Sequence, residues 1–453
     1  MYLTEKKVFK KKVNRDLYKQ LDDYSFKAKN LKNATNYLIK QCSRIGYKLK
    51  CGEILFSWEK AFILKVNKAI YEYNKKGHKL KYIDNNNNCL IDSYFLAYYL
   101  KNTVDYKALY STNAQIIIQE VCRDWKSYFE ALKDYKKNKS KYLGKPKIPG
   151  YLDSDKGRYW FTFTNQNIKL KDGILSLPKS LNFSDLIIKT NKNNIKQVRI
   201  KAEKKKITVH IIYDKEAKPM LSNNNRYMSI DLGLNNLATV VSNTEMNPFI
   251  IDGKKLKSIN QGYNKKIAKI QEQITVCNHK SSCKASYNLT NKRNLKVDDY
   301  LHKVSRIIVN KALKYNICKI IIGNNKGWKQ EVDLGKKTNQ SFVNIPYYRF
   351  IELIKYKANL LGIEVIIVEE SYTSGTSYID NEAPIINNYN KNRRVKRGLF
   401  KSNNGILINS DVNGAYQIMK KANIELIYKG FNESVERIAV CYPVKKRKTK
   451  TAA

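Results

Sequence analysis

Apolar residues recur at intervals of three and four positions through much of the first 135 residues. The segments 56–76 and 111–137 show this spacing clearly, and it places their apolar side chains on one face of a helix. We therefore predict a mostly helical block over 15–135, with Ser111 to Asn113 as candidates for the N-cap of its last helix. The opening segment YLTEKKVFKKKV instead predicts a strand.

The helical spacing ends at GKPKIPGY (144–151), where two prolines and two glycines interrupt the pattern. Short β segments follow at RYWFTFT, ILSLP, QVRIKAE and KITVHIIYD. The last of these alternates with a period of two at Ile207, Val209 and Ile211. The pattern predicts a β-rich unit, completed by the N-terminal strand, with the helical block inserted into it.

The chain beyond Arg226 alternates between the two kinds of pattern. Three strands (YMSIDLG, LATVVSN, PFIIDG) precede helical stretches at 257–275 and 297–315. Strand KIIIGN, helix PYYRFIELIKYKANLLG and strand EVIIVEE come next, and DVNGAYQIMKKA predicts a final helix after a loop of about forty residues. This order predicts an α/β domain with a mixed sheet, and it matches the pattern of the ribonuclease H fold.

Basic residues dominate the composition. Lysine and arginine number 86 against 39 acidic residues in a chain of 453, a formal net charge of +47. Such an excess repels itself in a compact state unless polyanions offset it, so the charge predicts nucleic-acid binding. An anionic membrane is the rival partner, but no amphipathic lipid anchor, apolar run of ~18 residues or signal peptide accompanies the charge. The eight cysteines form no CxxC pair, which favours free thiols in a reducing cytoplasm.

Acidic residues are scarce in this chain, yet several lie at the ends of predicted elements beyond Arg226. Asp231 follows the apolar MSI, Glu369 and Glu370 close a strand, and Asp411 opens a helix. Taken singly, each has an ordinary explanation: Asp231 as a turn residue, Glu370 as a surface acid, and Asp411 as an N-cap. Together on one sheet, without histidine or cysteine, such carboxylates are hard oxygen ligands suited to Mg²⁺ or Mn²⁺. Two such ions can activate water against a phosphodiester, so the cluster predicts a metal-dependent nuclease.

Four segments resemble motifs of the TnpB family, the insertion-sequence-encoded nucleases related to compact type V CRISPR effectors. These segments are MSIDLGLNNLATVVSN, KIIIGNNKGWKQ, EESYTSGTS and INSDVNGAYQI. The resemblance covers the chain from about Trp125 to Lys421. It implies an RNA-guided DNA endonuclease with a single RuvC site, a guide RNA as cofactor, and a short motif required beside the target.

The chain departs from that family at one catalytic position. Most members take their second RuvC acid from the strand represented here by KIIIGNN, which carries Gly323 and Asn324 and no acid. The resemblance to rearranged relatives implies that the neighbouring strand end supplies it, giving Asp231, Glu370 and Asp411 as catalytic, metal-binding residues. Glu369 is the reserve, because successive strand residues face opposite ways and only one of the pair should point at the metal.

A second departure concerns zinc. Many relatives begin a zinc ribbon at Thr-Ser-Lys-Thr-Cys, but here Gly375 stands at the lysine and Ser377 at the first cysteine. No cysteine lies between Cys318 and Cys441, so we expect no zinc in the insert 375–405. We expect its segment RRVKRGLF to form a basic hairpin that contacts target or RNA.

The resemblance and the basic composition together imply five parts. These are a wedge-like β-rich domain (1–13 and 136–225), a helical recognition lobe (14–135), a RuvC-like nuclease domain (226–374 and 406–425), a target-binding insert (375–405) and a basic tail (426–453). The expected partners are guide RNA and double-stranded target DNA, with no membrane, in the bacterial cytosol close to the nucleoid. A monomer and a homodimer both stay open. The candidate nucleic-acid-binding residues are Trp125, Lys126, Lys145, Lys147, Lys329, Gln330, Tyr372, Thr373, Ser374, Arg393, Arg394, Lys396 and Arg397.

Two other functions stay open. A guided DNA-binding repressor that no longer cuts would explain the missing acid at Gly323 and Asn324. An unguided ribonuclease H-like nuclease would need little beyond the sheet, so the long basic N-terminal half argues against it.

Overall fold

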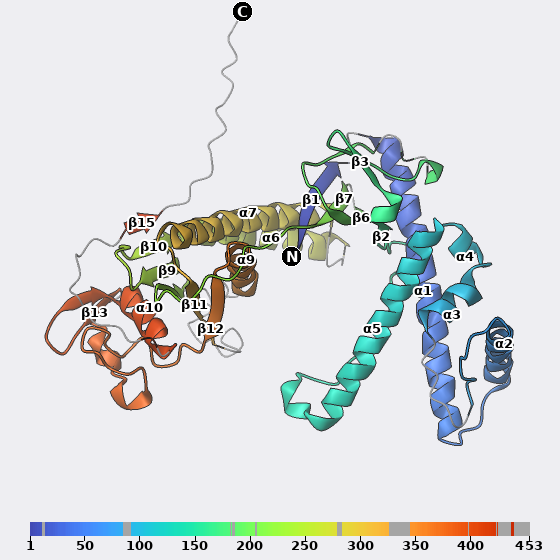
Figure 1. Cartoon of the computed structure of the whole chain (residues 1–453), viewed down its shortest axis with the longest axis horizontal. Coiled ribbons are helices and arrows are strands. Elements are labelled where there is room, and N and C mark those ends of the chain that lie inside the picture. Colours follow the sequence, from blue (N-terminus) through green and yellow to red (C-terminus); the bar gives the residue numbers. More distant parts are fainter. Residues whose placement is uncertain are drawn as a thin grey trace, which may run out of the picture. The chain divides into compact units, whose positions relative to one another are not determined.

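The computed structural model describes residues 1–10, 14–84, 92–181, 183, 186–203, 206–278, 283–325, 345–396, 398–422, 424 and 436–438. The chain divides into two compact units, Met1–Lys215 and Glu216–Ala453, each with its own buried core (Figure 1). The division lies before the predicted boundary at 225. None of the described helices is both long and apolar enough to span a membrane.

An antiparallel four-stranded sheet organises the first unit. Its order is β1 (Tyr2–Lys10), β7 (Lys206–Asp214), β6 (Ile195–Glu203) and β2 (Phe161–Thr164). The first strand of the chain pairs with β7 along its whole length, so it belongs to this β-rich unit as predicted. A smaller sheet contains β3 (Lys169–Lys171), β4 (Ile174–Ser176) and β5 (Ile188–Lys189).

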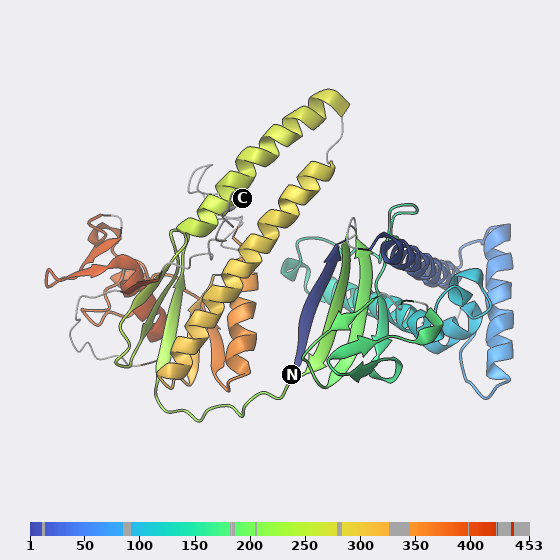
Figure 2. The ribbon, with the colours of Figure 1, turned by 90° about the horizontal axis from the view of Figure 1, so that it is seen from above.

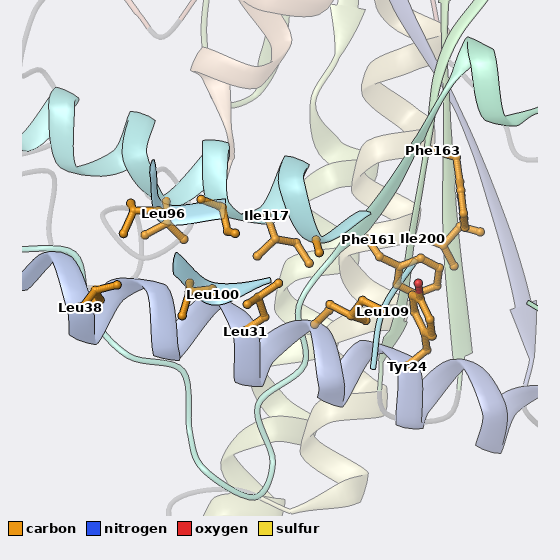
Figure 3. Packing of buried hydrophobic residues seen from close by; sticks show 14 of the residues in the cluster. Tyr24, Leu31, Leu38, Leu96, Leu100, Leu109, Ile117, Phe161, Phe163 and Ile200 are labelled. Carbon is orange, nitrogen blue, oxygen red and sulfur yellow. The ribbon is translucent and has the colours of Figure 1, made fainter. Parts of the chain in front are cut away.

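Helices follow β1 and precede β2 in the chain. They are α1 (Arg15–Lys50), α2 (Ser57–Asn74), α3 (Ser93–Leu100), α4 (Val104–Lys107) and α5 (Ser111–Lys137). Figure 3 shows Leu31 and Leu38 of α1 facing Leu96, Leu100 and Ile117 of α3 and α5. This packing continues into the sheet, where the Tyr24 ring meets the edge of Phe161 with 4.6 Å between centroids. The helical block and the sheet therefore share one core.

The predicted N-cap of α5 is wrong. The helix begins directly after Tyr110, which caps no backbone group with its side chain. Asn113 is fully buried, accepts a hydrogen bond from the Tyr24 hydroxyl at 2.9 Å and donates to the Thr162 carbonyl at 2.5 Å. Its amide is therefore used to join α1, α5 and β2 across the core, since a buried polar group requires partners.

A mixed six-stranded sheet forms the centre of the second unit. Its order is β12 (Glu364–Val368), β11 (Lys319–Gly323), β8 (Tyr227–Leu232), β9 (Asn236–Ser242), β10 (Phe249–Asp252) and β15 (Glu436–Ile438). β8, β9 and β10 run antiparallel in sequence, whereas β11 and β12 run parallel to β8. The expected α/β domain with a mixed sheet is confirmed.

Helices cover both faces of this sheet. The helices α6 (Lys254–Asn278) and α7 (Lys284–Lys314) pair side by side (Figure 2), and α7 packs with α9 (Tyr347–Asn359). Ile320 and Ile322 of β11 lie in the core with α7 and α9, whereas Ile321 lies in a second core with α10 (Ser410–Lys421). This alternation follows from the period of two along a strand. A short hairpin, β13 (Leu399–Lys401) with β14 (Leu407–Asn409), leads into α10.

Candidate metal and nucleic-acid site

Asp231 lies on β8 and faces α10. Its strand neighbours Met228, Ile230 and Leu232 are buried with α7 and α9, so the intervening residues face the other side of the sheet. Ser229 on that side donates its hydroxyl to the Ala415 carbonyl of α10 at 2.6 Å. The helix also approaches closely at Gly414, where an added Cβ would lie 3.2 Å from the Asp231 Oδ2.

The two adjacent glutamates after β12 have different surroundings. The Glu369 side chain is 68% exposed, and its carboxylate is 3.6 Å from the Lys421 ammonium. The Glu370 backbone N–H donates to Asn325 Oδ1 at 2.9 Å, while its Oε2 is buried and has no hydrogen-bond partner among the described residues. The structure therefore directs Glu370 inward and Glu369 toward solvent.

Asp411 is not the N-cap that its position suggests. Asn409 takes that role, since its Oδ1 accepts from the backbone N–H groups of Asp411 and Val412 at 3.0 and 3.2 Å. The Asp411 carboxylate is left for other contacts. It accepts a hydrogen bond from the Asn236 amide at 2.6 Å and lies 3.8 Å from the Arg394 guanidinium.

The electrostatics tie these three carboxylates together. Burial raises the pKa of Asp231 well above its ordinary value, and the charges of Glu370 and Asp411 raise it further, while Arg394 lowers it. Burial also raises the pKa of Glu370 from 4.5 to about 7, with Glu369 adding to the rise and Lys421 opposing it. Carboxylates in such surroundings are stabilised in their charged form when a cation lies between them.

The donor set fits a divalent cation in kind, because it offers only carboxylate and amide oxygens. The buried Glu370 Oε2 without a partner is the atom that most needs a cation or a donor. As the side chains stand, no three acidic, histidine or cysteine residues in the described part of the chain form a group that could hold a metal ion. The Asp411 carboxylate contacts Asn236 and Arg394 in this arrangement.

Gly323 makes room for Glu370. A Cβ at this position would lie 2.8 Å from the Glu370 Oε2 and 2.5 Å from the Cδ1 of Ile418, which is fully buried. The Glu370 carboxylate thus lies in the space into which a side chain at position 323 of β11 would extend. An acidic side chain at 323 would compete with Glu370 for that space.

The Tyr-Thr-Ser run after Glu370 is mainly a structural turn. Tyr372 has a φ of 65°, which is uncommon for a large side chain, and its ring meets the Tyr389 ring edge-on at 5.9 Å. Thr373 is buried and donates its hydroxyl to the Glu370 carbonyl at 2.8 Å, so its expected nucleic-acid contact is not available. Tyr372 is exposed and Ser374 is partly exposed, and both stay candidates.

Glu382 is the centre of the insert. Its carboxylate accepts from the Ser377 backbone N–H at 2.8 Å, Arg393 at 2.6 Å and the Asn403 amide at 3.2 Å. Burial alone would raise the pKa of Glu382, but Arg393 and the Ser377 N–H hold it below its ordinary value. The other end of the Arg393 guanidinium donates to Asn403, so this arginine serves the insert rather than a free nucleic-acid surface.

The expected basic hairpin begins later than predicted, since within RRVKRGLF only Leu399 and Phe400 belong to β13. Gly375 also has a local explanation: an added Cβ would lie 2.5 Å from the Tyr389 ring. A larger side chain at 375 would therefore require the Tyr389 ring to move.

Trp125 is the clearest correction among the candidate nucleic-acid residues. Its side chain is only 3% exposed, and its Nε1 donates to the Asn36 amide oxygen at 2.7 Å within the α1–α5 core. A ring in that position cannot stack on a base. Lys126, Lys145, Lys147 and Lys396 are exposed and stay candidates. Lys329, Gln330 and Arg397 lie outside the described residues.

The sequence patterns did not identify two residues of the site. Asn236 and Asn325 are polar residues in segments already quoted for other reasons, and only the structure shows that they hold Asp411 and the Glu370 backbone. Their signal in the sequence is weak, because asparagine is common in turns and this chain contains many asparagines.

Two family models and one curated relative match parts of the chain. The family model OrfB_IS605, described as a probable transposase, matches residues 210–329, and the Cas12f1-like TNB domain matches residues 347–418. The TnpB-like protein MJ0751 of Methanocaldococcus jannaschii is 31% identical over 177 residues, which span 38% of this chain and 61% of that relative.

Among solved structures, the chain is similar to a Cas12f1–sgRNA–target DNA complex at 15% identity and a TM-score of 0.34. That similarity covers 92% of this chain and 98% of the other. It is also similar to Alicyclobacillus acidoterrestris C2c1 with a single-guide RNA, at 9% identity and a TM-score of 0.36, over 90% of this chain and 67% of the other.

Proposed function

We propose that this chain is an RNA-guided DNA endonuclease of the TnpB family. The two family models and the curated relative support this proposal. The proposed reaction is Mg²⁺-dependent hydrolysis of target DNA beside a short flanking motif, in a single RuvC-like site. The observation that carries the proposal is the buried Glu370 Oε2 without a hydrogen-bond partner among the described residues, on a sheet whose Asp231 has its pKa raised by the charges of Glu370 and Asp411. The strand order and the helices of this unit support a ribonuclease H-like nuclease domain.

The side chains of this site have separate tasks in the proposal. Asp231, Glu370 and Asp411 would hold Mg²⁺ or Mn²⁺, which supplies activation of a water and stabilisation of the leaving oxygen. Asn325 fixes the backbone at Glu370, and Thr373 fixes the turn that follows it. Asn236 holds Asp411 from the β9 side. Arg394 lies where a positive charge offsets the carboxylates, and it is well placed to contact a phosphate.

Guide RNA and target DNA are the proposed partners. A formal net charge of +47 requires polyanions to offset it, and the relatives in the solved structures are complexes with guide RNA or with guide RNA and target DNA. In guided nucleases base pairing reads the target, whereas the protein reads only the short flanking motif.

A non-cutting guided repressor is the second candidate, and one observation favours it. No group of three described acidic, histidine or cysteine residues could hold a metal ion as it stands, and the resemblance implies an acid at the end of β11 where this chain has Gly323 and Asn324. Cleavage of a programmed target by the wild type would exclude this candidate. Binding of the same target without any cut would support it.

Sequencing of RNA that co-purifies with the protein, expressed together with its native flanking DNA, tests the proposed function. We expect one discrete RNA that ends in a variable segment. A plasmid carrying the complement of that segment, with a randomised flank, should then be cut in the presence of Mg²⁺. Random cellular RNA, with digestion of unprogrammed substrates, would instead indicate an unguided nuclease.

The raised pKa values predict how the metal-free protein responds to pH. The pKa of Glu370 is about 7 in the folded chain and 4.5 ordinarily, so the folded state binds more protons between these values. Its stability therefore falls as the pH rises through this window, by up to about 3 kcal/mol from this group. In EDTA, Glu370→Gln should melt several degrees above the wild type at about pH 7.5, and at nearly the same temperature at about pH 5.

Adding MgCl₂ or MnCl₂ should raise the melting temperature of the wild type at about pH 7.5 and leave Glu370→Gln nearly unchanged. The matched control is Glu369→Gln, since that side chain is exposed and should respond like the wild type. A difference between wild type and Glu370→Gln that stays constant across the pH range would contradict the assignment.

A further inference from the structure

The helix α2 lies beside the C-terminal part of α1 (Figure 1), and two aromatic rings at its start are exposed. Phe56 is 63% exposed and Trp58 is 47% exposed. Rings of this size are usually buried because each removes a large apolar area from water. Neither ring is needed by the proposed cleavage site, which lies wholly in the second unit.

A cationic side chain lies over each ring. The Lys48 ammonium lies 4.7 Å from the centroid of Phe56, and the Arg44 guanidinium lies 5.1 Å from the centroid of Trp58. Such contacts are favourable, but at exposed positions they contribute little to stability. We refer to Arg44, Lys48, Phe56 and Trp58 as the cation–ring platform.

A buried carboxylate fixes this platform. Glu59 is fully buried and lies 2.9 Å from Arg44 and 3.1 Å from Lys48. It also accepts the Phe56 backbone N–H at 3.0 Å. A buried charge is costly unless it is paired. The buried Glu59 carboxylate therefore needs both cations, and it holds them in place. The platform and Glu59 together have two cations and one carboxylate, a net charge of +1.

We propose that the cation–ring platform binds unpaired nucleotides of an RNA, with bases stacked on the exposed surface of Phe56 and Trp58 and phosphates held by Arg44 and Lys48. This inference rests on the proposed RNA-guided function. The pairing of a ring with a fixed cation matches a nucleotide, which offers a flat base and a negative phosphate.

The arrangement favours RNA with unpaired bases over the alternatives. The bases of a duplex are stacked inside it, so the two rings at the start of the protein helix α2 could not reach them. Sequence-independent binders of single-stranded DNA combine a positively charged groove that tracks the backbone with aromatic side chains that stack successive bases. The platform offers two rings only, which suits one or two bases splayed from a loop or bulge of a folded RNA. A second protein copy would have to bury the surplus positive charge, which is unfavourable.

The test uses the full-length protein and a fluorescein-labelled RNA hairpin with an unpaired uridine loop. A blunt RNA duplex with the same number of phosphates is the reference probe. Anisotropy titrations over a range of KCl concentrations should show that the double variant Phe56→Leu, Trp58→Leu binds the hairpin roughly tenfold more weakly. Duplex affinity should be unchanged. The slope of log affinity against log salt should also be unchanged, because no phosphate contact is removed.

Tyr71→Leu is the matched control. Tyr71 lies on the same helix, is 49% exposed and has the Lys75 ammonium 4.4 Å from its ring centroid, but the carboxylate beside Lys75, that of Glu72 at 3.6 Å, is itself exposed. We expect it to bind the hairpin within twofold of the wild type. The conservative double variant Phe56→Tyr, Trp58→Tyr should keep most of the affinity and the wild-type melting temperature, which separates lost stacking from misfolding.

Equal hairpin affinity in the leucine double variant and the wild type would overturn the inference. An equal loss with hairpin and duplex would also overturn it, as would loss of self-association in sedimentation with RNA binding intact, since the platform would then serve a second copy. If the wild type itself binds no RNA, the proposed function fails as well. Wild-type binding that the leucine variant matches removes only the platform.

Discussion

Asp231→Asn and Glu370→Gln should each lower the rate of target cleavage by about 10³-fold or more, with guide RNA binding retained. Each change removes a charged ligand from the proposed metal site, and a loss of about 4 kcal/mol of transition-state stabilisation gives this factor. The rates are measured in single-turnover cleavage of a programmed target with saturating MgCl₂. Melting temperatures without metal should rise rather than fall, because burial raises the pKa of both carboxyls.

Glu369→Gln is the control that the chain itself supplies. The two glutamates are adjacent and chemically identical, but Glu369 is mostly exposed and faces Lys421. We expect its cleavage rate to stay within about threefold of the wild type, since exposed ion pairs contribute little. A larger loss at Glu369 than at Glu370 would reverse the assignment of the second acid.

Gly323→Ala should slow cleavage by roughly 10- to 100-fold while leaving the three carboxylates in place in the sequence. The added methyl would meet the Glu370 Oε2 at 2.8 Å and the buried Ile418 Cδ1 at 2.5 Å. A displacement of about 1 Å at a reacting group can cost this much in rate, and overpacking a core costs about 1–3 kcal/mol in stability. Cleavage rates and thermal melts of the variant, both with MgCl₂, measure the two effects.

Gly262→Ala provides the comparison for glycine replacement as such. Gly262 lies on α6, and a Cβ there would meet nothing within 4 Å. Alanine should stabilise that helix by up to about 1 kcal/mol and leave cleavage unchanged. Wild-type cleavage by Gly323→Ala would show that the Glu370 carboxylate does not occupy the space beside β11 during the reaction.

The sequence predicts the architecture well because its signals are local. Alternation at Ile207, Val209 and Ile211 and the helical spacing over 111–137 both correspond to observed elements. Strand alternation predicts that only one of Glu369 and Glu370 faces inward, and the structure directs Glu370 inward, the residue that the family resemblance favours. A role for Glu370 in metal binding stays a prediction.

Contacts between distant segments could not be predicted from the sequence. The sequence places Trp125 in a basic segment, yet its indole N–H donates a hydrogen bond to Asn36, which lies 89 residues earlier. The adjacent arginines Arg393 and Arg394 are equivalent by composition, but one is held by Glu382 and the other lies beside Asp411. Such divisions depend on which side chains the fold brings together, and no spacing rule contains that information.

The insert around Glu382 is held together by hydrogen bonds and an ion pair instead of thiolates. This insert contains no cysteine, so we expect its integrity not to depend on thiolate-bound zinc or on thiol oxidation, which both limit ribbon-type modules. Chelators can accordingly be used to strip the proposed catalytic ion without dismantling this part of the molecule.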